Sequence, residues 1–409
     1  MRAHRIAIAA VLFAAVPAFL LRSGLGAAPI TVSTALFGLA IVAAAFALSW
    51  AAEAAERDVP RALALTAVAL LAVLPEYSVD IVFAWKAGQD PAFAPYAAAN
   101  MTGSNRLLLG IGWPAVVGFA WLRHRKTVVP LDRGSIPGLA FLAGATVYSF
   151  ILPLKGTISL VDSAVLFALF LAYAALAATA EKAEPDLVGP AATIGALPAL
   201  PRRLAIAGLL GFAFLTIAAS AAPFAEGLIH SGRALHVDEF LLVQWLAPFA
   251  SEAPEFLVAA LLASRGKGTA ALALLVSAKL NQWTLLVGSL PVAYSFGAGH
   301  AGALALDQRQ TAEVLLTAAQ SLFGLGVIAT LSLSLGRGAL LAGLFLSQIA
   351  LGGLLRVGLH APDAASTELL GFTVLYLLLA PLFFFRARGK TLRAPRISPC
   401  VVGGGGGDP

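Results

Sequence analysis

The sequence predicts an all-α protein that crosses a membrane about twelve times, as two inverted halves with one extra helix at each end. Three observations lead to this fold class. Hydrophobic residues make up 59% of the 409 residues and charged residues only 12%, whereas a soluble domain carries about 25% charged residues. Apolar runs recur along the whole chain, and a Pro-Glu motif inside one run reappears in the second half of the sequence.

Twelve apolar runs are long enough to cross a bilayer, since a membrane-spanning helix needs about 20 apolar residues. The runs lie at residues 5–21, 31–52, 62–86, 96–122, 136–154, 159–179, 203–226, 238–264, 269–296, 311–334, 338–358 and 366–385. A polar, proline-rich stretch separates the sixth run from the seventh, and its composition is typical of a linker.

These features divide the chain into six segments. They are an N-terminal extra helix or signal-like segment (1–30), a first repeat half (31–180), a cytoplasmic linker (181–202), a second, inverted half (203–358), an extra C-terminal helix (359–386) and a basic, glycine-rich tail that we expect to be disordered (387–409). The first segment has a second interpretation, because MRAHR followed by an apolar stretch and GLGAAP is also typical of a cleaved signal peptide. Cleavage would remove one helix and leave the other orientations unchanged.

The lysines and arginines indicate which helix ends face the cytoplasm. When the loops are numbered alternately from the N-terminus, nineteen of the 27 basic residues fall in one set, six fall in the other, and two lie inside spans. Cytoplasmic loops carry the excess of Lys and Arg, so both termini are predicted to be cytoplasmic, in a plasma (inner) membrane. A missed or invented helix would mix the two sets, so their separation also supports the helix assignment.

The stretch LAVLPEYSVD puts a proline and two carboxylates in the third run, although both residue types are costly within a membrane-spanning helix. The eighth run contains the similar stretch SEAPEFLVAA, so that Glu76 corresponds to Glu255. The next run in each half carries a polar break, in which Asn105 and Asn281 each lie seven residues before a glycine. An ordered set of Pro-Glu, Asn and Gly at similar spacing indicates an internal repeat.

The two copies of this repeat cross the membrane in opposite directions. Under the predicted topology the third run leads outward from the cytoplasm, and the eighth run leads inward. Inverted repeats with interrupted helices in matching positions are typical of secondary transporters that bind their substrate near the midplane. Glu76 lies about 14 residues into its run and Glu255 about 17, and at ~1.5 Å per residue both fall near the bilayer centre.

Pro-Glu in one helix and GSN in the next, repeated in inverted form, resembles the alpha repeats of the sodium/calcium exchanger family of cation/calcium antiporters. The resemblance is close over 71–113 and 246–291. It implies two five-helix halves, formed by the second to sixth and the seventh to eleventh runs. It also implies that the Pro-Glu glutamates and the Ser and Asn of the following helix bind a cation, which is exchanged by alternating access. On this sequence those residues are Glu76, Ser104, Asn105, Glu255 and, by its spacing to the next glycine, Asn281.

The sequence also departs from the family pattern, as a divergent bacterial-type member would. A serine or threonine usually precedes Leu-Pro-Glu in the family, but the first copy here has Ala72 and Val73. A further amide or acid usually follows GSN by three residues, whereas Leu108 and Thr284 stand at the aligned positions. Some of the expected calcium ligands are therefore absent from the pattern.

Two additional acids lie one helical turn from the glutamates, Asp80 beyond Glu76 and Glu252 before Glu255, so that each pair shares a helix face. Carboxylates, hydroxyls, amides and the carbonyls freed by proline supply the oxygen ligands that Na⁺ or Ca²⁺ requires, so we expect a rebuilt site. Other polar residues of these helices could act as ligands or hold neighbouring helices together. They are Asn100, Ser251, Ser277 and Thr284.

Two basic residues, Arg106 and Lys279, lie inside predicted spans beside the candidate asparagines. Each could pair with Asp80 or Glu252, or extend to the membrane interface. Alternatively, one of them occupies a cation subsite and alters the transport stoichiometry. This second hypothesis predicts that neutralising Lys279 changes the charge moved in each cycle.

The sequence thus favours a secondary active antiporter that exchanges Na⁺ or H⁺ for a cation, which the family resemblance implies to be Ca²⁺. Na⁺/H⁺ exchange without Ca²⁺ is the alternative, favoured by Leu108 and the two intramembrane bases. A passive channel would need a continuous polar stripe, which these sparsely polar helices do not offer. The sequence has no HExxH and no Walker A motif, so neither a metalloprotease nor an ATPase is expected.

The expected partners are the lipid bilayer and small inorganic cations, namely Na⁺, Ca²⁺ or H⁺. We expect no cofactor, no enzymatic activity and no nucleic-acid partner. The single cysteine, Cys400, excludes a disulfide within the chain. The exchanged ions, their stoichiometry and the oligomeric state stay open at this point.

Overall fold

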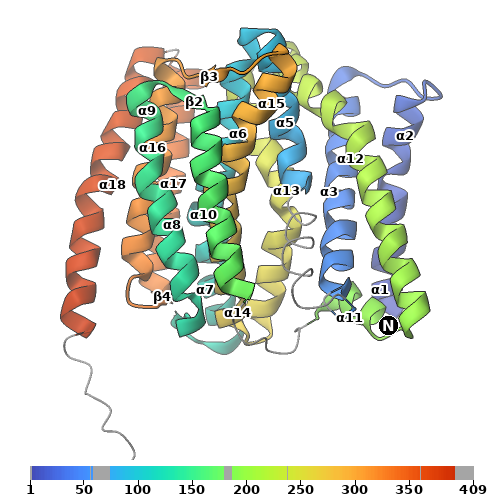
Figure 1. Cartoon of the computed structure of the whole chain (residues 1–409), viewed down its shortest axis with the longest axis horizontal. Helices are drawn as coiled ribbons and strands as arrows, with labels where there is room; N and C mark the ends of the chain where they lie inside the picture. The colour runs from blue at the N-terminus through green and yellow to red at the C-terminus, as the bar shows by residue number, and fades with distance from the viewer. Residues whose placement is uncertain are drawn as a thin grey trace, which may run out of the picture.

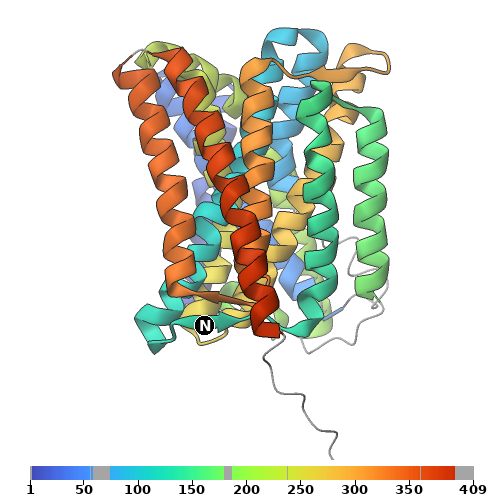
Figure 2. The same cartoon turned by 90° about the vertical axis from the view of Figure 1, so that its left-hand side faces the viewer.

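The computed structural model describes residues 2–55, 57–58, 74–178, 187–236, 238–359 and 361–391 of the chain. Long helices stand side by side in one bundle (Figure 1). The N-terminus and the end of the last described helix lie at the same end of this bundle (Figure 2), which we call the N-terminal end. The first part of the predicted third run, part of the predicted linker and most of the predicted tail lie outside the described residues.

The first half of the chain contains helices and two short strands. In order they are α1 (Arg2–Ala14), α2 (Val16–Arg22), α3 (Ile30–Ala55), α5 (Leu74–Gln89), η1 (Pro91–Phe93), α6 (Ala94–Leu107), η2 (Leu108–Gly112), α7 (Trp113–His124), β1 (Val128–Pro130), η3 (Arg133–Ser135), α8 (Ile136–Ser149), α9 (Ile151–Lys155), β2 (Thr157–Ser159) and α10 (Leu160–Ala178).

The second half repeats this arrangement after a short helix. Its elements are α11 (Gly189–Gly195), α12 (Ala199–Leu235), α13 (Glu239–Ser264), α14 (Gly268–Asn281), η4 (Gln282–Leu286), α15 (Val287–Ala298), β3 (Ala303–Ala305), α16 (Gln308–Ile328), β4 (Ser332–Ser334), α17 (Leu335–Gly353), η5 (Leu354–Gly358) and α18 (Pro362–Thr391). The last helix therefore extends five residues beyond the predicted start of the tail.

Ten helices of the described residues are long and apolar enough to cross a membrane, or eleven when α13 is counted as one bent span. The predicted number of twelve is thus not confirmed, because the third run, 62–86, lies within the described residues only from Leu74, where the 16-residue helix α5 begins. The axis of α13 turns by 55° between Glu239–Ala253 and Glu255–Ser264. This bend coincides with Pro254, which has no N–H for the helix and clashes with the preceding turn.

The order of elements confirms the inverted repeat. From α5 to α10 and from α13 to α17 the same sequence of spans and strands occurs. The broken spans match in length as well: α6 and α14 have 14 residues each, η2 and η4 are π-helical segments of 5, and α7 and α15 have 12. Each π segment therefore interrupts its span near the middle of the bundle.

Two small antiparallel sheets connect the halves, and they were not predicted from the sequence. Strand β1 pairs with β4, with Val129 opposite Leu333, and β2 pairs with β3, with Ile158 opposite Leu304. In both sheets one strand comes from each half of the chain, and the two sheets lie at opposite ends of the bundle (Figure 1). This placement is the one that inverted halves require.

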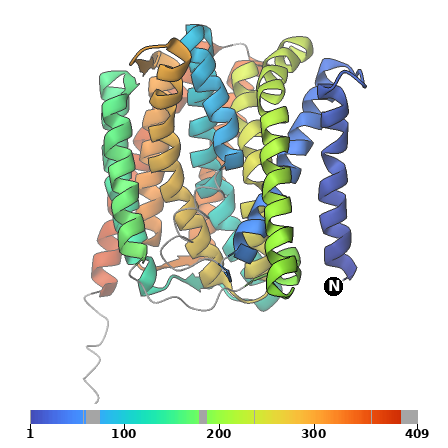
Figure 3. The same ribbon diagram turned by 45° about the vertical axis from the view of Figure 1, so that its right-hand side comes forward.

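Two close helix contacts shape the bundle. Helix α12 lies beside α3 at the edge that carries the N-terminal helices (Figure 3), and there Thr34 Oγ1 lies 3.1 Å from Ser231 Oγ. In the centre α6 crosses α13 at Gly103, where a Cβ atom would lie only 1.7 Å from the carbonyl oxygen of Gln244. Small residues of this kind let helix backbones approach closely in membranes.

The substitution Gly103→Ala should destabilise the protein, because the added methyl group collides with backbone of α13. Overpacking costs about 1–3 kcal/mol or more, so we expect a lower thermal unfolding midpoint in detergent. Gly118→Ala on α7 is the matched control, since a Cβ there meets nothing within 4 Å. Equal midpoints for the two variants would contradict this close contact.

At the N-terminal end, an ion pair ties the end of α3 to the start of α12. Arg202 donates from Nε and Nη2 to the two carboxylate oxygens of Asp58, each at 2.6 Å. The hydrogen bonds from Arg202 lower the pKa of Asp58 to about 2. Asp58 is therefore ionised throughout the physiological pH range. Its negative charge compensates part of the positive charge of Arg202 and Arg203 at this end of the bundle.

Candidate cation-binding site

The two Pro-Glu glutamates lie on α5 and on α13, and α13 bends beside its glutamate. The first described residues of α5, which include Glu76, lie about half-way along the bundle (Figure 1). The Glu76 side chain itself is outside the described part of the chain. Glu255 directly follows the bend in α13, and its side chain is half-buried. Helices α5 and α13 contact each other, as expected for matching elements of two halves.

Each additional acid accepts a hydrogen bond from a buried amide of the following broken span. The Asn100 side chain donates to Asp80 at 2.8 Å, and the Gln282 side chain donates to Glu252 at 2.8 Å. All four side chains are at most 1% exposed. Buried carboxylates require such donors, because an uncompensated polar group costs several kcal/mol inside a membrane.

Asp80 and Glu252 are both displaced from the Pro-Glu glutamates toward the same end of the bundle. Helix α5 runs away from the N-terminal end, whereas α13 runs toward it (Figure 1). Asp80 follows Glu76 by four residues and Glu252 precedes Glu255 by three, so both acids are displaced toward the opposite end. A perfectly inverted pair would be displaced in opposite directions, so the additional acids extend the site on one side only.

Lys279 lies between the halves, with its ammonium group on the candidate asparagine of the first half. Its Nζ donates to the carbonyl oxygen of Asn105 at 2.6 Å and to the amide oxygen of Asn105 at 2.8 Å. The side chain is completely buried, and Nζ lies 5.2 Å from the centre of the Trp283 ring. The predicted direct pair with Asp80 or Glu252 is therefore replaced by two neutral oxygens.

The broken spans correct the alignment between the halves. Counted from the starts of α6 and α14, Asn105 and Lys279 both stand at the twelfth residue, three residues before a π segment. The spacing to the next glycine had matched Asn105 with Asn281, which lies two residues after Lys279. The corrected register puts Gln282 opposite Leu108, so the amide expected after GSN is present in the second half and absent from the first.

Arg106 faces away from the site, toward α16 and α17. Its guanidinium donates to Glu313 at 2.5 Å and to Gln348, and it lies 4.9 Å from the centre of the Trp245 ring. The predicted pairs with Asp80 or Glu252 were thus wrong for this residue. Arg106 is 1% exposed and Glu313 is 3% exposed, so a buried ion pair stands directly beside Asn105.

The hydroxyl candidates use their hydrogens within their own helices. Ser104 donates to the carbonyl of Asn100 at 3.1 Å, Ser251 to that of Ala247 at 3.3 Å, and Thr284 to that of Leu280 at 2.6 Å. Their oxygen lone pairs stay available to a cation. Two other candidates, Ser277 and Asn281, are half-buried, and the Asn281 carbonyl accepts from the Tyr77 hydroxyl at 3.4 Å.

Sequence reasoning missed Gln282, Glu313 and Gln348. Gln282 could have been found from its position three residues after Lys279, had the register been right. No group of three His, Cys, Asp or Glu side chains that could hold a metal occurs among the described residues, and the Glu76 side chain is not one of these. The sequence expectation is a transported ion rather than a resident metal, and a site formed by acids and amides together fits that expectation.

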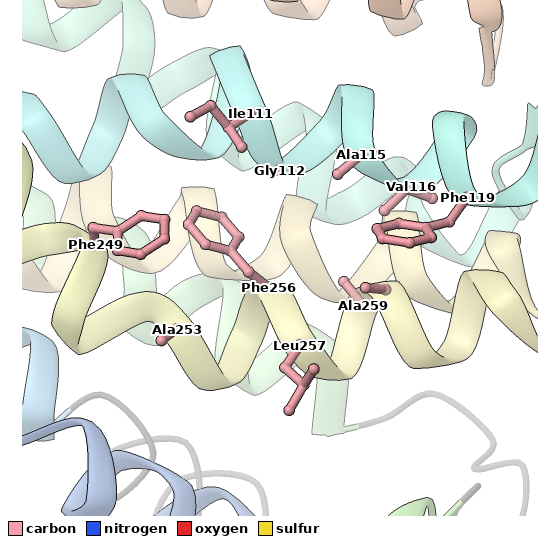
Figure 4. Close-up of a pocket in the computed structure, with 11 residues that line it drawn as sticks. Ile111, Gly112, Ala115, Val116, Phe119, Phe249, Ala253, Phe256, Leu257 and Ala259 are labelled. Atoms are coloured by element: carbon pink, nitrogen blue, oxygen red, sulfur yellow. The ribbon is translucent and has the colours of Figure 1, made fainter. Parts of the chain in front are cut away.

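A separate cleft lies between α13 and the consecutive elements η2 and α7 (Figure 4). It has a volume of about 280 Å³, and apolar side chains line it, among them Ile111, Phe119, Phe249 and Phe256. Phe249 and Phe119 are 52% and 38% exposed. Such a surface suits lipid chains and offers no oxygen ligand for a cation, so we do not assign ion binding to this cleft.

Inverted halves, interrupted spans and buried acids at the interruptions define the class of this protein, which is a multi-span membrane antiporter of cations. The family described as sodium/calcium exchanger protein matches residues 30–179 and 205–352. The chain belongs to this family. The resemblance inferred from Pro-Glu and GSN is thereby confirmed.

Solved structures extend this comparison. The crystal structure of the H⁺/Ca²⁺ exchanger CAX is 40% identical to this chain, covers 95% of it and 96% of its own chain, and superimposes with a TM-score of 0.87. Native YfkE is 16% identical, with 91% and 99% covered and a TM-score of 0.58. The sodium-calcium exchanger NCX_Mj is 18% identical, with 78% and 98% covered and a TM-score of 0.52. The last two show a shared fold alone. None of the curated proteins compared matches the chain.

Proposed function

We propose that the protein exchanges Ca²⁺ for H⁺ by alternating access, with Glu76 and Glu255 as the central cation-binding carboxylates. The observation that carries the proposal is the set of buried acid–amide pairs, Asp80–Asn100 and Glu252–Gln282, beside these glutamates in two inverted halves. The similarity to the H⁺/Ca²⁺ exchanger CAX over nearly the whole chain favours H⁺ over Na⁺ as the coupling ion.

The chemistry of the site explains why exchange would be obligatory. Several carboxylates at bilayer depth repel one another and lose their hydration when ionised. The site therefore needs either a divalent cation or protons to compensate this charge before it changes its side of access. Carboxyl, amide and hydroxyl oxygens of α5, α6, α13 and η4 are suitable ligands for Ca²⁺, and the carboxylates are the groups that take up protons in its place.

Lys279 would act as a fixed cation within this site. Its ammonium already uses the two oxygens of Asn105, the kind of ligand that a transported Na⁺ would need. The positive charge of Lys279 at this position would compensate one carboxylate of the site. The protein would then require fewer transported cations in each turnover than a relative with a neutral residue there.

A second candidate function is Na⁺/H⁺ exchange without Ca²⁺. It is favoured by Leu108, which is completely buried at the position where the first half would offer an amide or acid, and by the ammonium of Lys279. Ca²⁺ takes six to eight oxygen ligands, so a site with one ligand replaced by Leu108 and two oxygens bound to Lys279 is less suited to it.

Flux into proteoliposomes distinguishes these functions. We expect an outward proton gradient to drive uptake of Ca²⁺, with a Na⁺ gradient of equal size driving much less. Uptake of Ca²⁺ driven by Na⁺ alone would favour Na⁺/Ca²⁺ exchange. Proton-driven Na⁺ uptake with no Ca²⁺ uptake under any gradient would contradict the proposal and support the second candidate.

The location, the orientation and the partners of the protein belong to the same proposal. The protein would reside in the plasma (inner) membrane with both termini in the cytoplasm. The basic residues in alternate loops support this orientation, as does the position of the start of α1 and the end of α18 at the same end of the bundle. It would act without enzymatic activity, resident cofactor or nucleic acid. Ca²⁺ and H⁺, with Na⁺ as the alternative, would be its only small-molecule partners.

A further inference from the structure

A second group of buried charges lies outside the candidate cation site, around Glu368 of α18. This helix is the extra C-terminal element and has no counterpart in the two repeat halves. Glu368 is 8% exposed, and the side chains of Gln348 and Glu313 beside it are 5% and 3% exposed. An acid from an added helix thus reaches the interior of the bundle.

Gln348 connects Glu368 to Arg106. The amide oxygen of Gln348 accepts a hydrogen bond from the Arg106 guanidinium. The amide nitrogen of Gln348 and Oε2 of Glu368 lie against the same glycine, because a Cβ on Gly352 would be 3.6 Å from the first atom and 3.3 Å from the second. A glycine at position 352 therefore provides the space that Glu368 occupies.

Glu368 differs from the other buried acids in its hydrogen bonds. Within the described residues neither of its oxygens accepts a hydrogen bond of regular geometry, and the Gln348 amide is the donor that acts on it. The charged and titratable groups that act on it are Arg106 from α6, Glu313 from α16, Arg356 from η5 and Tyr376 from α18. Arg106 is already bound to Glu313, so among the described residues Arg356 is the cation left to compensate an ionised Glu368. No ion pair joins the two described side chains at 4 Å or less, and a carboxylate without a close partner is costly in a membrane.

We propose that Glu368 binds a proton at a site separate from the cation site, and that this proton controls transport through Gln348 and Arg106. Protonated Glu368 is neutral and leaves Gln348 and Glu313 on Arg106. Ionised Glu368 attracts the Gln348 amide and competes with Glu313 for the guanidinium. Arg106 directly follows Asn105, whose two oxygens hold Lys279, so a change at Glu368 would reach the cation site through Gln348, Arg106 and the backbone that joins Arg106 to Asn105.

The first test measures proton binding and does not require transport. Infrared absorption of the purified full-length protein is titrated with pH, and the spectrum of Glu368→Gln is subtracted from that of the wild type. We expect a protonated-carboxyl band that is present only in the wild type and disappears as the pH rises. A difference spectrum without such a band at any pH would overturn the proposal, whether or not the protein transports Ca²⁺.

The second test measures the control of transport, and this part rests on the proposed Ca²⁺/H⁺ exchange. We expect Glu368→Gln, which resembles the protonated acid, to keep the maximal Ca²⁺ flux and to lose one of the pH-dependent steps of the wild type. Gln348→Met should lose the same step while keeping the infrared band, because the connection to Arg106 is broken. Identical pH profiles for wild type and Glu368→Gln would overturn the proposal.

Controls keep this test independent of folding. Glu226→Gln removes an acid that is 46% exposed and pairs with Lys86 away from the cluster, and it should leave both the infrared band and the pH profile unchanged. If Glu368→Gln does not fold, Glu368→Asp takes its place, and the band and the pH-dependent step should then shift together. A shift of one without the other would overturn the coupling between them.

Discussion

The substitution Glu255→Gln should strongly reduce coupled Ca²⁺ transport while the protein stays folded. Glutamine keeps the shape of the side chain but removes both the charge that holds the cation and the group that takes up a proton. Interactions of a charged group contribute about 1.5–3 kcal/mol, so we expect Ca²⁺ flux to fall about 10- to 100-fold or more. Glu76→Gln in the first half should have an effect of similar size, because the inverted halves contribute matching glutamates.

Flux in proteoliposomes and thermal unfolding in detergent together measure this effect. Glu239→Gln is a matched control, since Glu239 begins the same helix α13 but is 28% exposed and pairs with Arg233 at the end of the bundle. The control should transport at a normal rate. Normal transport by both Glu76→Gln and Glu255→Gln would show that the site is assigned to the wrong residues.

Neutralising Lys279 should change the electrical charge moved in each transport cycle. The substitution Lys279→Gln removes the fixed positive charge and releases the two oxygens of Asn105. A proton or small cation can then bind at this position in one half of the cycle, and the stoichiometry changes by one charge. We expect a shift in the voltage at which net Ca²⁺ flux reverses, measured in proteoliposomes at fixed ion gradients.

The matched control for Lys279 is Lys86→Gln. Lys86 lies near the end of α5, is 22% exposed and pairs with Glu226, so it cannot occupy the cation site. Its reversal voltage should equal that of the wild type. An unchanged reversal voltage in Lys279→Gln would restrict Lys279 to a structural role and contradict the idea of a fixed cation.

Much of the fold could be predicted from the sequence because it depends on long, local patterns. Apolar runs indicated the spans, and the matching of Glu76 with Glu255 together with the distribution of basic residues indicated the inversion. The strands could not be predicted in this way. Each has three residues, and Val129 pairs with Leu333 across about half of the chain, so no local periodicity indicates them.

The acids of the candidate site could be predicted from the sequence, but the partners of its buried side chains could not. Asn281 was matched where Lys279 belongs because the alignment relied on Gly112 and Gly288, which are not equivalent. Gly112 is the last residue of its π segment, whereas Gly288 lies two residues beyond the end of the other. The partners of Arg106 were missed for a different reason. Glu313 and Gln348 lie 207 and 242 residues away, and their approach depends on how α16 and α17 pack against α6, which the sequence of α6 alone does not contain.

The most direct test of coupled exchange follows Ca²⁺ and pH in the same proteoliposomes, with the membrane voltage held at zero. Two dyes report Ca²⁺ entry and proton exit after a Ca²⁺ gradient is applied without Na⁺. If the protein is a Ca²⁺/H⁺ antiporter, Ca²⁺ enters only while protons leave, in a fixed ratio, and both fluxes fall together in Glu255→Gln. Entry of Ca²⁺ down its gradient without any proton exit would indicate a passive pathway and contradict coupled Ca²⁺/H⁺ exchange.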